Sequence, residues 1–127
     1  MKSAFEVYRR SLALLGQEEG ENTDGFEKRA PDLINLLLAR LTELDLNLKG
    51  NVESPYPLPQ QIDSLEDLIG LEEVIVLSAL PIGLAALLIQ EEEPERASYF
   101  TQLFEKECGS LRQRCRKGRR HKIRRSF

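Results

Sequence analysis

The side chains of this 127-residue chain that could act as nucleophiles or bases are few and do not converge. Cys108 and Cys115 are the two cysteines, and His121, near the C-terminal end, is the one histidine. A catalytic thiol needs a base held within hydrogen-bond reach, and no histidine falls in a stretch predicted to be ordered. The seven-residue cysteine spacing, without a CxxC pair, also predicts neither a disulfide framework nor a zinc site.

Patterns for binding phosphate or a hard cation are equally weak. The glycines at 16, 20 and 25 lack the GxxxxGK spacing of a phosphate-binding loop. The acid runs Glu18–Glu19 and Glu91–Glu93 carry oxygen ligands, but adjacent glutamates at a helix boundary are typical of a solvated edge. We therefore expect no enzymatic activity, no catalytic residue, no cofactor and no metal ligand.

The strongest electrostatic feature is the C-terminal end of the chain. From residue 112 onward there are nine Lys or Arg and no acids, so the preceding part holds 9 basic and 21 acidic residues. This asymmetry indicates a solvated acidic body with one basic arm. The candidate contacts to a polyanion or a protein partner are Arg112, Arg114, Arg116, Lys117, Arg119, Arg120, Lys122, Arg124 and Arg125.

Two interpretations of this basic segment stay open. It could contact a phosphate backbone with salt-dependent, sequence-independent affinity. It could also be a solubilising end, or an arm for an acidic protein surface. On a helical projection its first four basic residues point around the whole circumference, which argues against base readout by a recognition helix.

The elements that must position these groups are organised around residues 71–90, LEEVIVLSALPIGLAALLIQ. Its uncharged run, Val74 to Ile89, is 16 residues long, against about 20 for a bilayer span. A helix apolar on nearly every side must be buried on nearly every side. We therefore expect a central core helix, kinked at Pro81, and no membrane span.

Two helices are predicted before this segment. Ser3 and Glu6 form a capping box that opens the first, and Gly16 ends it. The second begins either near Asp24, with a kink at Pro31, or near residue 30, and it ends at Gly50. Its predicted buried face comprises Ile34, Leu37, Leu38, Leu41, Leu44 and Leu48.

The remaining segments are a proline-rich spacer and a last helix. Three prolines within residues 52–61 predict an extended spacer or an arm reaching a neighbour. Pro94 is expected to open the last helix, whose apolar stripe comprises Ala97, Phe100, Phe104, Cys108, Leu111 and Cys115. Both cysteines are therefore expected to be small core residues.

The fold class predicted from these patterns is all-α, with about four helices around the kinked central one. Residues 1–116 are predicted to form a helical domain, and residues 117–127 a basic flexible tail that is disordered in isolation. The amphipathic N-terminal stretch does not have the continuous apolar run of a signal peptide, so we expect a cytoplasmic protein.

The order of parts resembles the small head–tail connector, or neck adaptor, proteins of tailed phages and prophages. The resemblance runs from Ser11 to Glu107 and is most specific in SALPIGLAALLIQEEEPERASYFTQLFE. There an alanine- and leucine-rich helix broken by Pro-x-Gly is followed by an acidic loop and a helix with an aromatic pair. The basic tail matches no motif of that family.

This resemblance implies a virion structural protein without an active site. Its subunits would form a homo-oligomeric ring at the virion neck, contacting the portal and other neck or tail proteins, after synthesis in the host cytoplasm. The alternative is a small nucleic-acid-associated regulator that uses the basic tail, with non-specific DNA contact. A helical adaptor for another cytoplasmic partner is also compatible with the residues.

Overall fold

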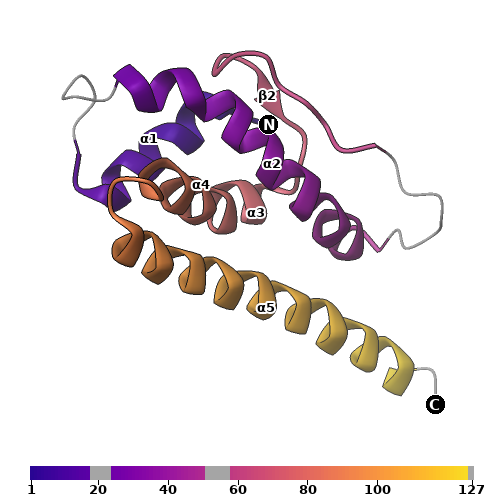
Figure 1. The fold of residues 1–127 in the computed structure, drawn as a ribbon. Helices are drawn as coiled ribbons and strands as arrows, with labels where there is room; N and C mark the ends of the chain where they lie inside the picture. The colour runs from indigo at the N-terminus through magenta and orange to yellow at the C-terminus, as the bar shows by residue number, and fades with distance from the viewer. Residues whose placement is uncertain (18–23, 51–57, 126–127) are drawn as a thin grey trace.

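The computed structural model describes residues 1–17, 24–50 and 58–125, without the side chains of Asp24 and residues 115–125 (Figure 1). The fold is mostly helical, as expected from the sequence. The elements are β1 (Lys2–Ser3), α1 (Ala4–Leu15), α2 (Asp24–Leu48), β2 (Leu68–Ile69), α3 (Glu73–Leu77), α4 (Ala79–Ile89) and α5 (Pro94–Arg125).

The two strands form a short sheet that the sequence did not predict. β1 and β2 are antiparallel, with Lys2 opposite Ile69 and Ser3 opposite Leu68. Two further backbone bonds continue the contact into α1, because the amides of Ala4 and Phe5 donate to the carbonyls of residues 67 and 65. The start of α1 is thereby fixed against the segment at 62–69.

Helix α1 begins and ends where its capping residues predict. The Ser3 hydroxyl accepts a hydrogen bond from the amide of Glu6 at 3.4 Å, which satisfies one of the free donors of the first turn. Gly16 follows the helix with a φ of 72°, a left-handed conformation that glycine adopts without a side-chain clash. Four apolar residues recur at helical spacing in α1: Tyr8, Leu12 and Leu15 are buried, whereas Phe5 is only half-buried.

Helix α2 starts at Asp24 and contains Pro31, so the longer of the two predicted forms is correct. Five of the six residues expected on its inner face are buried, and Leu48 is half-buried. Gly50, with a φ of 75°, lies just beyond the helix end. The spacer prolines 55 and 57 lie outside the described residues, and the backbone from Leu58 to Asp67 has no helix or strand.

The single kinked helix expected at residues 71–90 is not confirmed. The segment forms two helices, α3 and α4, with Ser78 between them at φ −119° and ψ −77°. Pro81 lies in the first turn of α4. Its ring disfavours a helical carbonyl four residues earlier, at Leu77, and it has no amide to donate to that carbonyl. The break therefore falls one turn before the proline.

Helix α4 is the centre of the fold and packs against α1, α2, α3 and α5. Nine of its eleven residues are buried, as the apolar sequence predicted. A β-carbon placed on Gly83 would lie 2.8 Å from Leu37 Cδ2 and 3.0 Å from Phe104 Cδ2. Gly83 thus lets α2 and α5 approach the α4 backbone closely.

Helix α5 starts at Pro94, as predicted, and its backbone is helical as far as Arg125. The disordered tail expected from residue 117 is therefore not confirmed. The residues after Cys115 are mostly arginine and lysine, which have good helix propensity, and no proline interrupts them. The division into a domain of residues 1–116 and a tail of residues 117–127 stays a prediction.

None of the helices in the described ranges combines the length and the apolar character needed to cross a bilayer.

Candidate interaction surfaces

The two buried polar side chains among the described residues hold helices together. The Asp45 Oδ1 atom on α2 accepts a hydrogen bond of 2.6 Å from the amide of Glu72, the N-cap residue of α3. Its Oδ2 atom lies 2.8 Å from Lys49 Nζ. The Ser11 hydroxyl lies 2.9 Å from the Pro81 carbonyl and so connects α1 to α4. The Asp45 carboxylate and the Ser11 hydroxyl are therefore both bonded to other parts of the chain and stabilise the fold.

Two amide side chains position the segment at 60–70. Asn35 on α2 donates to the carbonyl of Ile62 at 2.9 Å and accepts from the amide of Ile62 at 2.8 Å. Gln60 does the same within the segment, donating to the Leu68 carbonyl at 2.6 Å and accepting from the Gly70 amide at 2.8 Å. These paired bonds fix a stretch that has almost no regular secondary structure.

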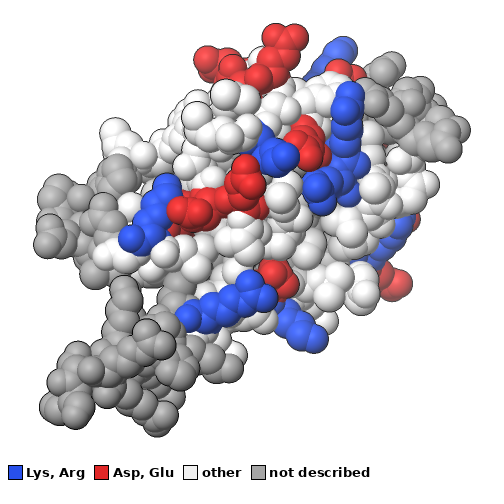
Figure 2. All heavy atoms as spheres, turned by 180° about the vertical axis from the view of Figure 1, so that it is seen from behind, with Lys and Arg blue, Asp and Glu red and all other residues white. Residues whose placement is uncertain are grey.

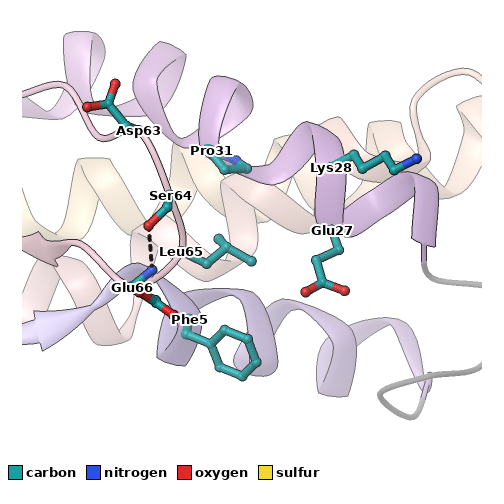
Figure 3. A pocket seen from close by; sticks show the side chains of 8 residues that line it. All are labelled: Phe5, Glu27, Lys28, Pro31, Asp63, Ser64, Leu65 and Glu66. Carbon is teal, nitrogen blue, oxygen red and sulfur yellow. Dashed lines mark hydrogen bonds between the residues drawn. The ribbon is translucent and has the colours of Figure 1, made fainter.

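The segment held in this way forms one wall of an open groove of about 700 Å³ (Figure 3). The start of α1 forms the second wall, and the first two turns of α2 form the third. The groove is lined by Phe5, Glu27, Lys28, Pro31, Asp63, Ser64, Leu65 and Glu66.

The groove combines apolar surface with negative charge. In Figure 3 the Phe5 ring, the Leu65 side chain and the Glu27 carboxylate point into the space between α1 and α2. Lys28 and Asp63 extend away from it. Three of the four charged residues in the lining are acidic. This lining suits a side chain with an apolar stem and a cationic end.

Asp67 stabilises the turn at residues 63–66, which lines one side of the groove. Its Oδ2 atom accepts hydrogen bonds from the amides of Asp63 at 2.7 Å and Ser64 at 3.2 Å. These two bonds stabilise the carboxylate and lower the pKa of Asp67 below its usual value. The Ser64 hydroxyl in turn accepts from the amide of Glu66 at 3.2 Å (Figure 3).

A second groove lies between α1 and the α3–α4 junction. It has a volume of about 380 Å³ and is lined by Arg10, Ala13, Leu14, Leu77, Ser78, Pro81 and Ile82. Leu14 is 43% exposed at its edge. This lining is mainly apolar, in contrast to the acidic groove at Phe5.

The structure brings none of the predicted basic contact residues into a described cluster. Arg112 and Arg114 are exposed on α5. The side chains of Arg116, Lys117, Arg119, Arg120, Lys122, Arg124 and Arg125 lie outside the described part, although the backbone that carries them is helical. On the face shown in Figure 2, lysines, arginines and acids are interspersed over the body. This face therefore presents no continuous basic area among the described residues.

The reactive residues singled out from the sequence do not form a site among the described side chains. Cys108 is buried, as expected for a core residue, and burial raises the pKa of its thiol. The side chains of Cys115 and His121 lie outside the description. Within the described ranges, no group of three or more histidine, cysteine or acidic side chains is placed to hold a metal ion.

Sequence reasoning missed the groove at Phe5. Helical spacing by itself assigns Phe5 to the apolar face of the first helix, and the spacing of Asp24 and Glu27 assigns Glu27 to a helix cap. No local pattern links these residues to Leu65 and Glu66, which are about 40 to 60 positions away in the chain. The groove forms only because β1, β2 and Asn35 bring the three segments together.

Comparisons with models of protein families, with curated proteins and with solved structures found no match to this chain.

Proposed function

We propose that this protein is a structural assembly protein, a head–tail connector subunit that forms a ring by contacts with the portal and with neighbouring subunits. The observation that carries the proposal is the resemblance of residues 11–107, which is densest in the segment that folds as α4 and the first part of α5. The proposal thus rests on a sequence pattern. On this proposal the protein is located at the virion neck and, before assembly, in the host cytoplasm.

The way the polar groups are used supports an assembly role. The buried Asp45 and Ser11 join helices, and Asn35 and Gln60 hold a loop. The described surface offers open grooves, among them the acidic one at Phe5 and the apolar one beside the α3–α4 junction. Such surfaces suit contacts with other proteins, without catalysis, cofactor, metal or membrane.

The direct test is mass spectrometry of DNA-filled particles purified from an induced culture of the source organism. We expect peptides of this protein together with portal and major capsid protein. A binding assay with the purified portal protein of the same prophage gives the second readout. Particles in which portal and capsid are detected without this protein would remove the connector assignment.

The second candidate function is a small nucleic-acid-associated regulator, favoured by the exposed Arg112 and Arg114 at the start of the basic segment. It predicts binding to duplex DNA that weakens steeply as salt concentration rises. A chain ending at Leu111 should lose this binding. Equally poor binding by the full-length and shortened proteins at low salt would contradict this function.

A further inference from the structure

We propose that the acidic groove at Phe5 is the docking site for the basic C-terminal segment of a second copy of this chain, residues 112–125. The resulting contact is head-to-tail between neighbouring subunits. It deepens the proposed assembly function and rests on it, since a ring requires one repeated contact between copies.

The first observation is the reach of α5. Leu111 is the last buried residue described on this helix, and the helical backbone continues to Arg125. At 1.5 Å per residue this extension is about 21 Å long. It carries all nine basic residues of the segment and no acids. In Figure 1 it leaves the body at the yellow end of the ribbon.

The second observation is the chemistry of the groove. Phe5, Pro31 and Leu65 supply apolar surface, and Glu27 and Glu66 supply negative charge. An arginine side chain matches both parts, because its stem is apolar and its guanidinium binds carboxylates in two-pronged geometry.

The groove and the basic segment of one chain lie too far apart to meet. Arg29, near the start of α2, donates to the carbonyl of Leu88, just before α5 begins. Farther along, Arg40 on α2 pairs with Glu105 on α5 at 2.6 Å. The two helices thus run in the same direction, and the groove at the start of α2 is remote from the end of α5. In Figure 1 these two regions lie at opposite ends of the molecule.

The occupant is therefore a second copy. A contact between two different patches of the same chain is heterologous, and it closes into a ring when the rotation between copies closes. The charge balance fits this arrangement, because an acidic body meets a basic arm at every contact.

The test is sedimentation velocity of the full-length chain over a concentration series at about 50 mM and about 300 mM salt. We expect species larger than the monomer at low salt, reduced at high salt. Glu27→Lys/Glu66→Lys reverses the charge of two acids in the groove. Arg119→Glu/Arg120→Glu/Arg124→Glu/Arg125→Glu leaves the arm with five basic and four acidic residues in place of nine basic ones. Each variant alone should associate about tenfold more weakly than the wild-type chain.

The decisive step is to mix the two variants. The groove variant keeps a basic arm and the arm variant keeps an acidic groove, so the mixture should form dimers at concentrations at which either variant alone is mostly monomeric. The matched control is Glu43→Lys/Glu91→Lys, which makes the same charge change at two exposed acids outside the groove. Far-UV circular dichroism checks that each variant is folded.

Three results would overturn the proposal: a wild-type chain that stays monomeric at low salt, a control as weak as the groove variant, or a mixture that does not restore association. Portal binding is measured separately on the same variants. A groove variant that binds portal but does not self-associate would leave the connector function intact and support the docking site. A wild-type chain that self-associates through the groove without binding portal would retain the docking site and remove the connector function.

Discussion

At the scale of single residues, Gly83 is the described glycine at which an added β-carbon would lie closest to other side chains. Its missing side chain lets Leu37 and Phe104 approach the backbone of α4 from two other helices. Gly109, on α5, is the useful contrast because a β-carbon there would have no atom within 4 Å. The structure therefore has no room for a β-carbon at Gly83 but has room for one at Gly109.

We predict that Gly83→Ala lowers the free energy of unfolding by about 1–3 kcal/mol, because Leu37 or Phe104 must move to admit the methyl group. Gly109→Ala should raise it by up to about 1 kcal/mol, because alanine favours the helix and meets no neighbour. Urea unfolding followed by circular dichroism measures both. A neutral or stabilising effect at Gly83 would refute the close approach of the three helices.

Asp67 gives a prediction on pH at the same scale. The pKa of its carboxyl is lowered in the folded chain by the amides of Asp63 and Ser64, so the folded state binds a proton less readily than the unfolded state. The stabilisation is therefore present above the unfolded pKa of about 3.9 and is lost as the pH falls through the folded value.

The urea midpoint of the wild-type chain should accordingly fall more between pH 6 and pH 3 than that of Asp67→Asn, which keeps an oxygen acceptor but does not titrate. Asp32→Asn, an exposed acid on α2, is the control for general charge effects. If the urea midpoints of the wild-type chain and Asp67→Asn fall in parallel with pH, the two hydrogen bonds from the amides do not favour the ionised carboxyl.

At the scale of elements, α5 has two parts with different roles. Its first half packs on α4 through Ala97, Phe100, Phe104, Cys108 and Leu111, which are all buried. The residues from Arg112 to Arg114 are exposed, and none of the described core lies beyond Leu111. Among the described side chains of α5, the contacts with the core therefore end before the basic segment begins.

We predict that a chain ending at residue 114 keeps the unfolding free energy of the full-length protein within about 0.5 kcal/mol, the range typical of changes away from the core. A chain ending at residue 107 also loses the buried Cys108 and Leu111 and should be less stable by about 2–5 kcal/mol. Urea unfolding of the three chains tests this. A large loss on removal of residues 115–127 alone would assign the basic segment a part in the core.

At the scale of the whole molecule, one hydrophobic cluster connects every described helix. It includes Tyr8 of α1, Ile34 of α2, Ile75 of α3, Leu84 of α4 and Phe104 of α5. Its centre is α4, which contacts the four other helices. No described part of this core can be lost without exposing apolar surface on another helix.

Unfolding in urea should therefore be a single cooperative transition. The loss of helix in far-UV circular dichroism and the change in tyrosine fluorescence, which includes the buried Tyr8, should share one midpoint. Leu84→Ala should shift both midpoints together. Two separated transitions, with the α1 region unfolding first, would contradict the single core.

What the sequence by itself determined is the predominantly helical character of the chain and several of the helix ends, because these depend on neighbours in the chain. The Ser3 cap, Gly16, Gly50 and Pro94 each act within one turn, so local chemistry was enough to place them. The buried faces of α2 and α5 followed from helical periodicity for the same reason.

Only the tertiary structure decided the features that join distant segments. The break at Ser78 fell a turn before Pro81, in a segment where packing on all sides obscured any periodic signal. The sheet between β1 and β2, the amide bonds of Asn35 to Ile62 and the acidic groove at Phe5 all join residues that local patterns cannot relate. Local propensity acts within a few residues, whereas these contacts form only after the chain has folded back on α4.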